Sequence, residues 1–273
     1  MSQTNEQTAG NDSEVSATRE GPVFRITMRR AKRRNALSRS LVSGLLGAFQ
    51  TATSDREIRV VVLEGDGPVF CAGGDISEYV DAARTGTAEA TADGLTDLLS
   101  AITTCPAPVI AKVQGAAYGG GFGLVCAADL AVASMDARFS LSEARLGLVP
   151  ATISPYVIAA LGPRQAKARM LLAEPFSAEE ARQMGLVHAV TDPGSLDDRV
   201  NYLVNQLLRS APGALTIIKR LPAMLTGADS ASARAITAQL LVERLASDEG
   251  QEGLRAFLDK RPPAWAPESR ESS

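Results

Sequence analysis

The chain has 273 residues, of which 45% are hydrophobic and 22% are charged, which is enough for one well-buried core with an added subdomain. Its 28 Lys and Arg residues and 31 Asp and Glu residues give a net charge of −3, and this offers no basic footprint for nucleic acid or an anionic membrane. The longest charge-free apolar stretch, Gly115 to Ala128, is too short to span a bilayer. The sequence therefore predicts a soluble protein with neither kind of partner.

Cysteine and histidine usage limits metal and disulfide chemistry. Cys71, Cys105 and Cys126 are widely spaced and form no C-x-x-C pair, which is typical of buried, reduced thiols in a cytoplasmic protein. The single histidine, His188, cannot build a multi-histidine metal site. We expect no metal, and we expect His188 to be an ordinary strand residue.

The N-terminal segment differs in composition from the rest. Residues 1–18 are polar and carry three acids, and they lack the apolar stretch of a signal peptide and the basic character of a transit peptide. They are predicted to be a disordered, dispensable tail. The expected organisation is a tail over 1–18, an α/β core over 19–196 and a helical subdomain over 197–273.

The first half of the chain alternates between strand and helix patterns. Val23–Met28 alternates apolar and polar residues like a strand, and Ser38 can cap an amphipathic helix. Ile58–Leu63 is a β-branched run typical of a buried strand. A helical segment after Asp75 and a second helix over about Leu95–Thr104 lead to another apolar strand, Val109–Val113.

In the second half, the predicted pattern changes near residue 190 from alternating strands and helices to helices alone. Gly121–Ala128 is predicted to be a helix and Leu130–Ala133 a strand, and Ser177–Glu180 is a capping box for a helix that ends at Gly185. From about Asp197 onward the pattern is helical only. This order predicts an α/β layered core followed by a C-terminal helical subdomain.

Two glycine-rich turns carry the first chemical signal. Ala72–Asp75 and Tyr118–Gly121 each follow an apolar strand and precede a helix. A helix N-terminus leaves N–H groups without internal partners, so two such turns facing each other could bind one oxygen anion. Two tight turns that bind nothing are the plain alternative. The spacing fits neither a dinucleotide fingerprint, a P-loop nor a nucleophile elbow.

An acid in an apolar segment carries the second signal. Glu143 lies within Phe139–Pro150, where burial would raise the pKa of its carboxyl and suit it to proton transfer. An ion pair with Arg145 is the alternative, and Arg145 could instead attract a carboxylate of the substrate. Asp75 is expected to be a helix cap, and Glu78 and Asp81 either reach the acyl pocket or form a solvated helix face.

Together these segments resemble the crotonase superfamily, the enoyl-CoA hydratase/isomerase family. The resemblance runs from Arg30 to the C-terminus and covers several motifs in family order: Arg34-Asn35-Ala36-Leu37-Ser38, Phe70 to Ile76, Ala117 to Gly121, Asp129, Phe139 to Pro150, and Gly250 to Trp265. The resemblance implies an α/β fold, a crotonase-like spiral of ββα units with a C-terminal helical trimerisation subdomain. It also implies a homotrimer or homohexamer.

The resemblance further implies the site residues. The N–H groups of Gly74 and Gly120 would form the oxyanion hole, and Glu143 would be the catalytic acid/base. The acyl-CoA thioester would be the substrate, with no other cofactor, since coenzyme A enters as part of it. Its binding residues would lie in the segment Lys32–Ala36, in the turn Ala72–Gly74 and in the C-terminal segment, namely Lys32, Arg34, Ala36, Ala72, Gly73, Gly74, Gly120, Phe257 and Lys260.

One departure narrows the expected reaction. Typical hydratases of the family carry a second glutamate just after the glycine turn, where this chain has Gly123. The form of the turn and the segment Leu141–Val157 are most similar to the single-glutamate branch of methylglutaconyl-CoA and other branched enoyl-CoA hydratases. The alternatives are a Δ3,Δ2-enoyl-CoA isomerase, which needs one base, and a catalytically silent scaffold.

Overall fold

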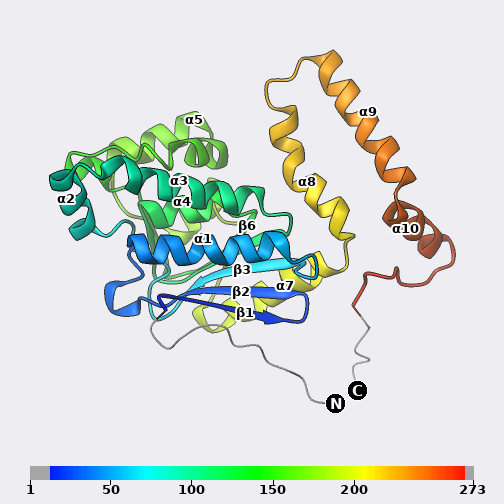
Figure 1. Ribbon diagram of the computed structural model, residues 1–273, viewed down its shortest axis with the longest axis horizontal. Helices are drawn as coiled ribbons and strands as arrows, with labels where there is room; N and C mark the ends of the chain where they lie inside the picture. The colour runs from blue at the N-terminus through cyan, green and yellow to red at the C-terminus, as the bar shows by residue number, and fades with distance from the viewer. Residues whose placement is uncertain (1–12, 268–273) are drawn as a thin grey trace.

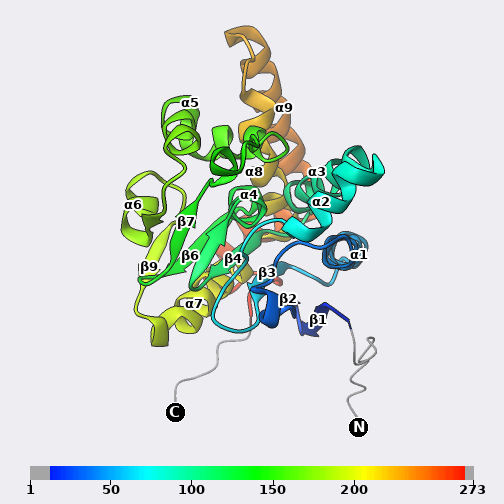
Figure 2. The same ribbon diagram turned by 90° about the vertical axis from the view of Figure 1, so that its left-hand side faces the viewer.

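A six-stranded sheet in the order β1-β2-β3-β4-β6-β9 organises the computed structural model, which describes residues 13–267 (Figures 1 and 2). A second, three-stranded sheet has the order β5-β7-β8. All neighbours pair in parallel except β1 with β2 and β7 with β8. The strands are β1 (Val15–Glu20), β2 (Val23–Met28), β3 (Val60–Gly65), β4 (Val109–Val113), β5 (Ala116–Tyr118), β6 (Leu130–Ser134), β7 (Arg138–Ser140), β8 (Phe176–Ser177) and β9 (Ala189–Thr191).

The chain runs through repeated ββα units. After β4 joins the large sheet, β5 joins the small one and α4 follows; β6, β7 and α5 repeat the same order. This confirms the predicted α/β crotonase fold. The helices of the body are α1 (Arg39–Ser54), α2 (Ile76–Thr85), α3 (Ala88–Thr104), α4 (Gly120–Ala127), α5 (Ser154–Leu172), α6 (Ala178–Gln183) and α7 (Leu196–Leu208), with short 3-10 turns η1 (Ala31–Arg33), η2 (Glu143–Leu146) and η3 (Pro193–Ser195).

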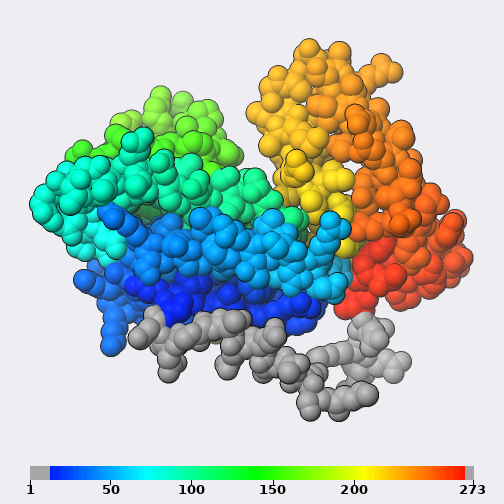
Figure 3. All heavy atoms as spheres, in the orientation of Figure 1, coloured from blue at the N-terminus to red at the C-terminus, as the bar shows by residue number. Residues whose placement is uncertain are grey.

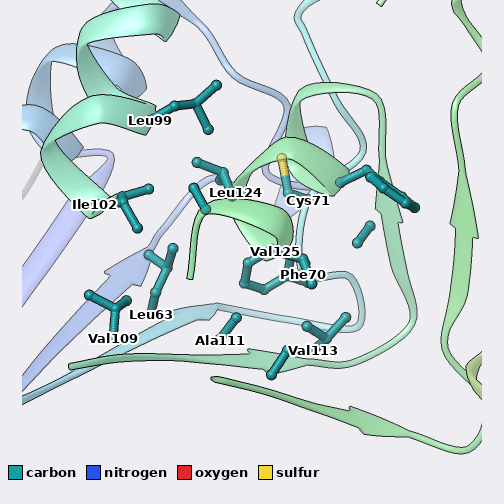
Figure 4. Close-up of a cluster of buried hydrophobic side chains, with 14 of the residues drawn as sticks. Leu63, Phe70, Cys71, Leu99, Ile102, Val109, Ala111, Val113, Leu124 and Val125 are labelled. Atoms are coloured by element: carbon teal, nitrogen blue, oxygen red, sulfur yellow. The ribbon is translucent and has the colours of Figure 1, made fainter. Parts of the chain in front are cut away.

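The large sheet is covered on both faces because its strands are apolar on both sides. Val61 and Leu63 of β3 face the main core, which α1, α3 and α4 close, whereas Val60 and Val62 face α7. Figure 4 shows the main core around Leu63, with its neighbours from α3, α4 and β4. Two packed layers therefore hold the strand ends, and the turns that follow them, in fixed positions.

Three further helices, α8 (Pro212–Leu225), α9 (Ser230–Ala246) and α10 (Asp248–Leu258), form the C-terminal extension. Figure 3 shows them as a lobe that stands apart from the body. No residue of α8 or α9 is buried. Lys219 of α8 nevertheless fixes this lobe to the body, since its ammonium lies 2.7 Å from the half-buried carboxylate of Asp129. Within residues 13–267, no helix has the length and apolarity to cross a bilayer.

Two predicted boundaries need correction. β1 begins at Val15, so the predicted tail over 1–18 is wrong for residues 15–18; residues 1–12 lie outside the described part of the chain. The carboxylate of Glu14 also accepts hydrogen bonds from Arg30 and Ser38, each at 2.7 Å. The predicted boundary at 196/197 falls in the first turn of α7, which packs on the sheet. The helical extension therefore begins at α8.

Candidate active site

The first glycine turn, residues 72–74, is fixed by the segment before α1. Ala72 N–H donates to the Arg34 carbonyl at 2.9 Å, and Leu37 N–H donates to the Gly73 carbonyl at 2.7 Å. Gly73 has φ +100°, a backbone conformation that favours glycine. Within the described chain the N–H of Gly74 donates to no acceptor. The turn thus leaves the Gly74 N–H available to a ligand.

The second turn lies against the first. Tyr118 N–H donates to the Cys71 carbonyl at 3.0 Å, and Gly119 N–H donates to the Ser140 carbonyl at 3.0 Å. Gly120 is the first residue of α4, and its N–H has no acceptor among the described residues because the helix supplies none there. A Cβ on Gly120 would lie only 3.8 Å from the Gly74 nitrogen. The two free N–H groups are therefore neighbours, as an oxyanion hole requires.

Glu143 follows β7 and starts η2, opposite these turns. A Cβ on Gly119 would lie 3.0 Å from one of its carboxylate oxygens, Oε1. The other oxygen, Oε2, is buried and has no hydrogen-bond partner within residues 13–267. Burial raises the pKa of the Glu143 carboxyl above its ordinary value. Arg145 is exposed, and no ion pair joins it to Glu143 in the described residues, so the alternative of a Glu143–Arg145 pair is wrong.

These groups share one cavity of about 500 Å³. α2, α3, η2 and the segment 148–153 enclose it. Its polar groups are the turn amides, Glu143, the Tyr79 hydroxyl and a few Ser and Thr hydroxyls, and no Lys or Arg is among the residues that line it. Apolar side chains supply the rest: Ile76, Ala82, Ala83, Ala88, Ala92, Leu95, Leu146, Leu148, Val149, Pro150, Ala151 and Ile153. Such a mostly apolar cavity with a few convergent polar groups is typical of a small-molecule site.

Ile153 fills the space beside Gly123. A Cβ on Gly123 would overlap the Ile153 side chain, which is 2% exposed and lines the cavity. The position where typical family hydratases carry their second glutamate is thus occupied by hydrocarbon from a different segment. Among the residues that line this cavity, Glu143 is the one carboxylate.

Several predicted site residues come together and others do not. Gly74, Gly120, Glu143, Ala72 and Gly73 all line the cavity. The remaining five do not: Lys32 and Arg34 are exposed beside the first turn, Ala36 is half-buried, and Phe257 and Lys260 lie at the α10 end of the molecule (Figure 1).

The other acids and the histidine have structural contacts. Glu78 accepts from the Arg39 N–H at 2.8 Å, and Asp81 pairs with Arg84 at 3.2 Å; neither lines the cavity. Asp75 caps α2 as predicted, accepting from Ser77 N–H at 3.1 Å. His188 accepts through Nδ1 from the Ala131 N–H at 3.1 Å. In residues 13–267 there is no group of three or more His, Cys, Asp or Glu that could hold a metal.

Sequence reasoning missed Tyr79 and Ile153. Tyr79 belongs to a face of α2 with helical spacing, formed by Ile76, Tyr79, Ala82 and Ala83, which lines the cavity. That spacing is the signal that could have identified it. Ile153 carries no such signal, because its contact with Gly123 joins segments thirty residues apart.

Comparison with known proteins agrees with this geometry. The family model described as enoyl-CoA hydratase/isomerase matches residues 18–268. The chain belongs to this family. It is 36% identical to "Enoyl-CoA hydratase ACTT6" of Alternaria alternata over 233 residues, covering 84% of this chain and 76% of the relative. It is 33% identical to "Enoyl-CoA hydratase domain-containing protein 3, mitochondrial" of Mus musculus, covering 94% and 87%.

Solved structures give the same result. An enoyl-CoA hydratase from Shewanella pealeana superposes with a TM-score of 0.88 at 34% identity, covering 92% of this chain and 96% of that chain. AtuE of Pseudomonas aeruginosa superposes with a TM-score of 0.89 at 35% identity, covering 93% and 100%. Both confirm the predicted family and the crotonase fold.

Proposed function

We propose that this chain adds water to an enoyl-CoA, or removes it in the reverse direction, with Glu143 as the one acid/base and the N–H groups of Gly74 and Gly120 as the oxyanion hole. By homology the enzyme is an enoyl-CoA hydratase, a hydro-lyase. One observation carries the proposal: two neighbouring backbone N–H groups, which have no acceptor among the described residues, share a cavity with one half-buried carboxylate. An acyl-CoA thioester is the substrate typical of the family.

The proposed reaction balances with one carboxylate. Glu143 takes a proton from water as the water oxygen bonds to the β-carbon. The electrons of the C=C bond move toward the thioester oxygen, where the Gly74 and Gly120 N–H groups stabilise the enolate. The protonated Glu143 then returns its proton to the α-carbon. The product has gained one water, and the glutamate is again ionised.

The cavity lining favours an uncharged acyl group. A carboxylate on the acyl chain would be buried beside the like charge of Glu143. No Lys or Arg lines the cavity to pair with it. A branched apolar enoyl-CoA therefore fits better than a carboxylated one such as methylglutaconyl-CoA. We propose that the coenzyme A part of the substrate binds to the backbone of Ala72 and Gly73 and to Lys32, Arg34 and Ala36.

The positions of Phe257 and Lys260 are a reason to expect an oligomer. Both lie on the C-terminal lobe, away from α2 and the cavity of the same chain (Figure 1). We propose that they serve the coenzyme only through a second copy, within a homotrimer or homohexamer. A cytoplasmic location stays a prediction, and the mouse relative's name includes "mitochondrial".

A Δ3,Δ2-enoyl-CoA isomerase is the second candidate, because one carboxylate suffices to move a proton between two carbons. A panel of straight, branched and carboxylated 2-enoyl-CoAs, with 3-enoyl-CoAs alongside, separates the two. Hydration predicts loss of the conjugated-thioester absorbance and a product that has gained one water. Conversion of a 3-enoyl-CoA without gain of water, and no hydration of any 2-enoyl-CoA, would support the isomerase instead.

A further inference from the structure

Tyr79 lies directly over one glycine of the oxyanion turn. α2 begins two residues after Gly74, and its first turn brings Tyr79 back over that glycine, with Tyr79 N–H donating to the Asp75 carbonyl at 3.1 Å. A Cβ on Gly74 would overlap the hydroxyl oxygen, Cζ and Cε2 of the Tyr79 ring. The phenol end of the side chain, rather than its stem, therefore contacts Gly74.

The Tyr79 hydroxyl is free to act on a ligand. It has no hydrogen-bond partner among the described residues, and the half-buried side chain lines the same cavity as Gly74, Gly120 and Glu143. Burial raises the pKa of the phenol, and the Glu143 carboxylate raises it further. The hydroxyl is therefore protonated at neutral pH and can donate.

We propose that the Tyr79 hydroxyl donates a third hydrogen bond to the thioester enolate oxygen, beside the N–H groups of Gly74 and Gly120. This inference rests on the proposed function, since it names a further donor for the same intermediate. An oxyanion can accept three hydrogen bonds, and a donor that is fixed in a cavity partly shielded from water stabilises it strongly. Tyr79 keeps its own proton throughout, so the proton balance between water, Glu143 and the α-carbon is unchanged.

The Tyr79 hydroxyl matters more in this cavity because the second glutamate of typical family hydratases is absent from its lining. Ile153 occupies the space beside Gly123, so that wall of the cavity offers hydrocarbon rather than a polar group. Among the atoms nearest to a Cβ on Gly74 or Gly120, the Tyr79 hydroxyl is the one polar side-chain atom. The phenol end of Tyr79 therefore lies on the Gly74 side of the cavity.

The test uses the full-length enzyme and the Tyr79→Phe variant, which removes only the hydroxyl. The matched control is Tyr156→Phe, since Tyr156 of α5 is also half-buried but does not line the cavity. The probe is acetoacetyl-CoA, a 3-oxoacyl-CoA whose bound enolate is followed by ultraviolet absorbance against pH. Oxyanion donors stabilise the enolate and lower the pH at which it forms.

We expect Tyr79→Phe to shift enolate formation to higher pH and to lower kcat by about 10–100-fold, less than the 10²–10³-fold typical of losing a main oxyanion donor. Tyr156→Phe should match the wild type in both readings. An unchanged enolate titration in Tyr79→Phe would overturn the inference, whether or not kcat falls. If the wild type stabilises the enolate but hydrates none of the enoyl-CoA panel, the proposed function fails while the Tyr79 donor stands.

Discussion

Ile153 occupies the space that a side chain at Gly123 would need. The side chain of Ile153 lies where a side chain at Gly123 would begin, so the loss of a glutamate there is matched by apolar packing. Glu143 is consequently the one carboxylate among the residues that line the cavity. Restoring a second acid requires a change at both positions.

We predict that Gly123→Glu alone will destabilise the enzyme without raising hydration. Overpacking a filled site costs about 1–3 kcal/mol, and here a carboxylate is buried as well. The double variant Gly123→Glu/Ile153→Ala makes room and should recover much of that stability relative to Gly123→Glu. Urea unfolding and turnover of the best enoyl-CoA are the measurements. A single Gly123→Glu variant as stable as the wild type would show that Ile153 does not block this position.

The raised pKa of Glu143 predicts a pH effect on turnover. The base must be ionised to accept a proton from water, and burial favours its neutral form. The acid limb of the pH–kcat profile should therefore lie above 4.5, the ordinary value of a glutamate. An acid limb at or below that value would exclude a buried carboxyl as the base.

The same burial predicts an effect on stability with a defined sign. Since the pKa in the folded state is raised, the stability associated with protonated Glu143 is present at low pH and is lost as pH rises through the folded pKa. Glu143→Gln should therefore melt at a higher temperature than the wild type at pH 7, and the difference should shrink toward pH 4. Calorimetry at both pH values measures this, and a lower melting temperature of the variant at pH 7 would contradict it.

The elements differ in how well the sequence predicted them. β2 and β4 have the predicted bounds, and β3 and β6 lie within two residues of theirs, because their apolar residues are buried on the sheet. β1 was missed because only Val15 in VSATRE is buried. It is an edge strand that pairs through its backbone, so it has no apolar pattern. β5, β7 and β8 have two or three residues, too few for any periodicity.

We predict that a chain starting at Arg19 will be less stable than the full chain. That truncation removes Val15 and most of β1, and it removes Glu14, which pairs with Arg30. Arg30 in turn pairs with Asp75, the cap of α2, at 2.8 Å. Losing the β1 pairing and this partner should cost about 2–4 kcal/mol. The control is a chain starting at Ser13, and equal melting temperatures for both truncations would contradict the role of β1.

At the scale of the whole molecule, the sequence indicated residues of the candidate site only where they are close in the chain. The two glycine turns and Glu143 lie in compact segments whose composition indicates their role. Tyr79 and Ile153 act through contacts that only the fold creates. Leu207 and Leu208 of α7 likewise contact the large sheet, which lies far from them in the sequence.

The C-terminal lobe presents apolar side chains to solvent. The members with at least 45% exposure are Ile218, Leu241, Val242, Leu245, Leu254, Phe257 and Leu258. Such a surface is typical of an interface. We predict a stable oligomer in sedimentation at micromolar concentration, and we predict that Leu241→Asp with Phe257→Asp will shift it toward the monomer. A wild type that sediments as a monomer would contradict the proposed assembly.

The most direct test of the account is the turnover of an enoyl-CoA by wild type and Glu143→Gln, followed by loss of the conjugated-thioester absorbance. The substitution keeps size and hydrogen bonding but removes the base. We predict that kcat falls by about 10²–10⁴-fold, the usual contribution of general acid–base catalysis. Acyl-CoA binding should change little, because the free N–H groups of Gly74 and Gly120 are unaffected. Near-normal turnover by Glu143→Gln on the best substrate would contradict the assignment of Glu143 as the base.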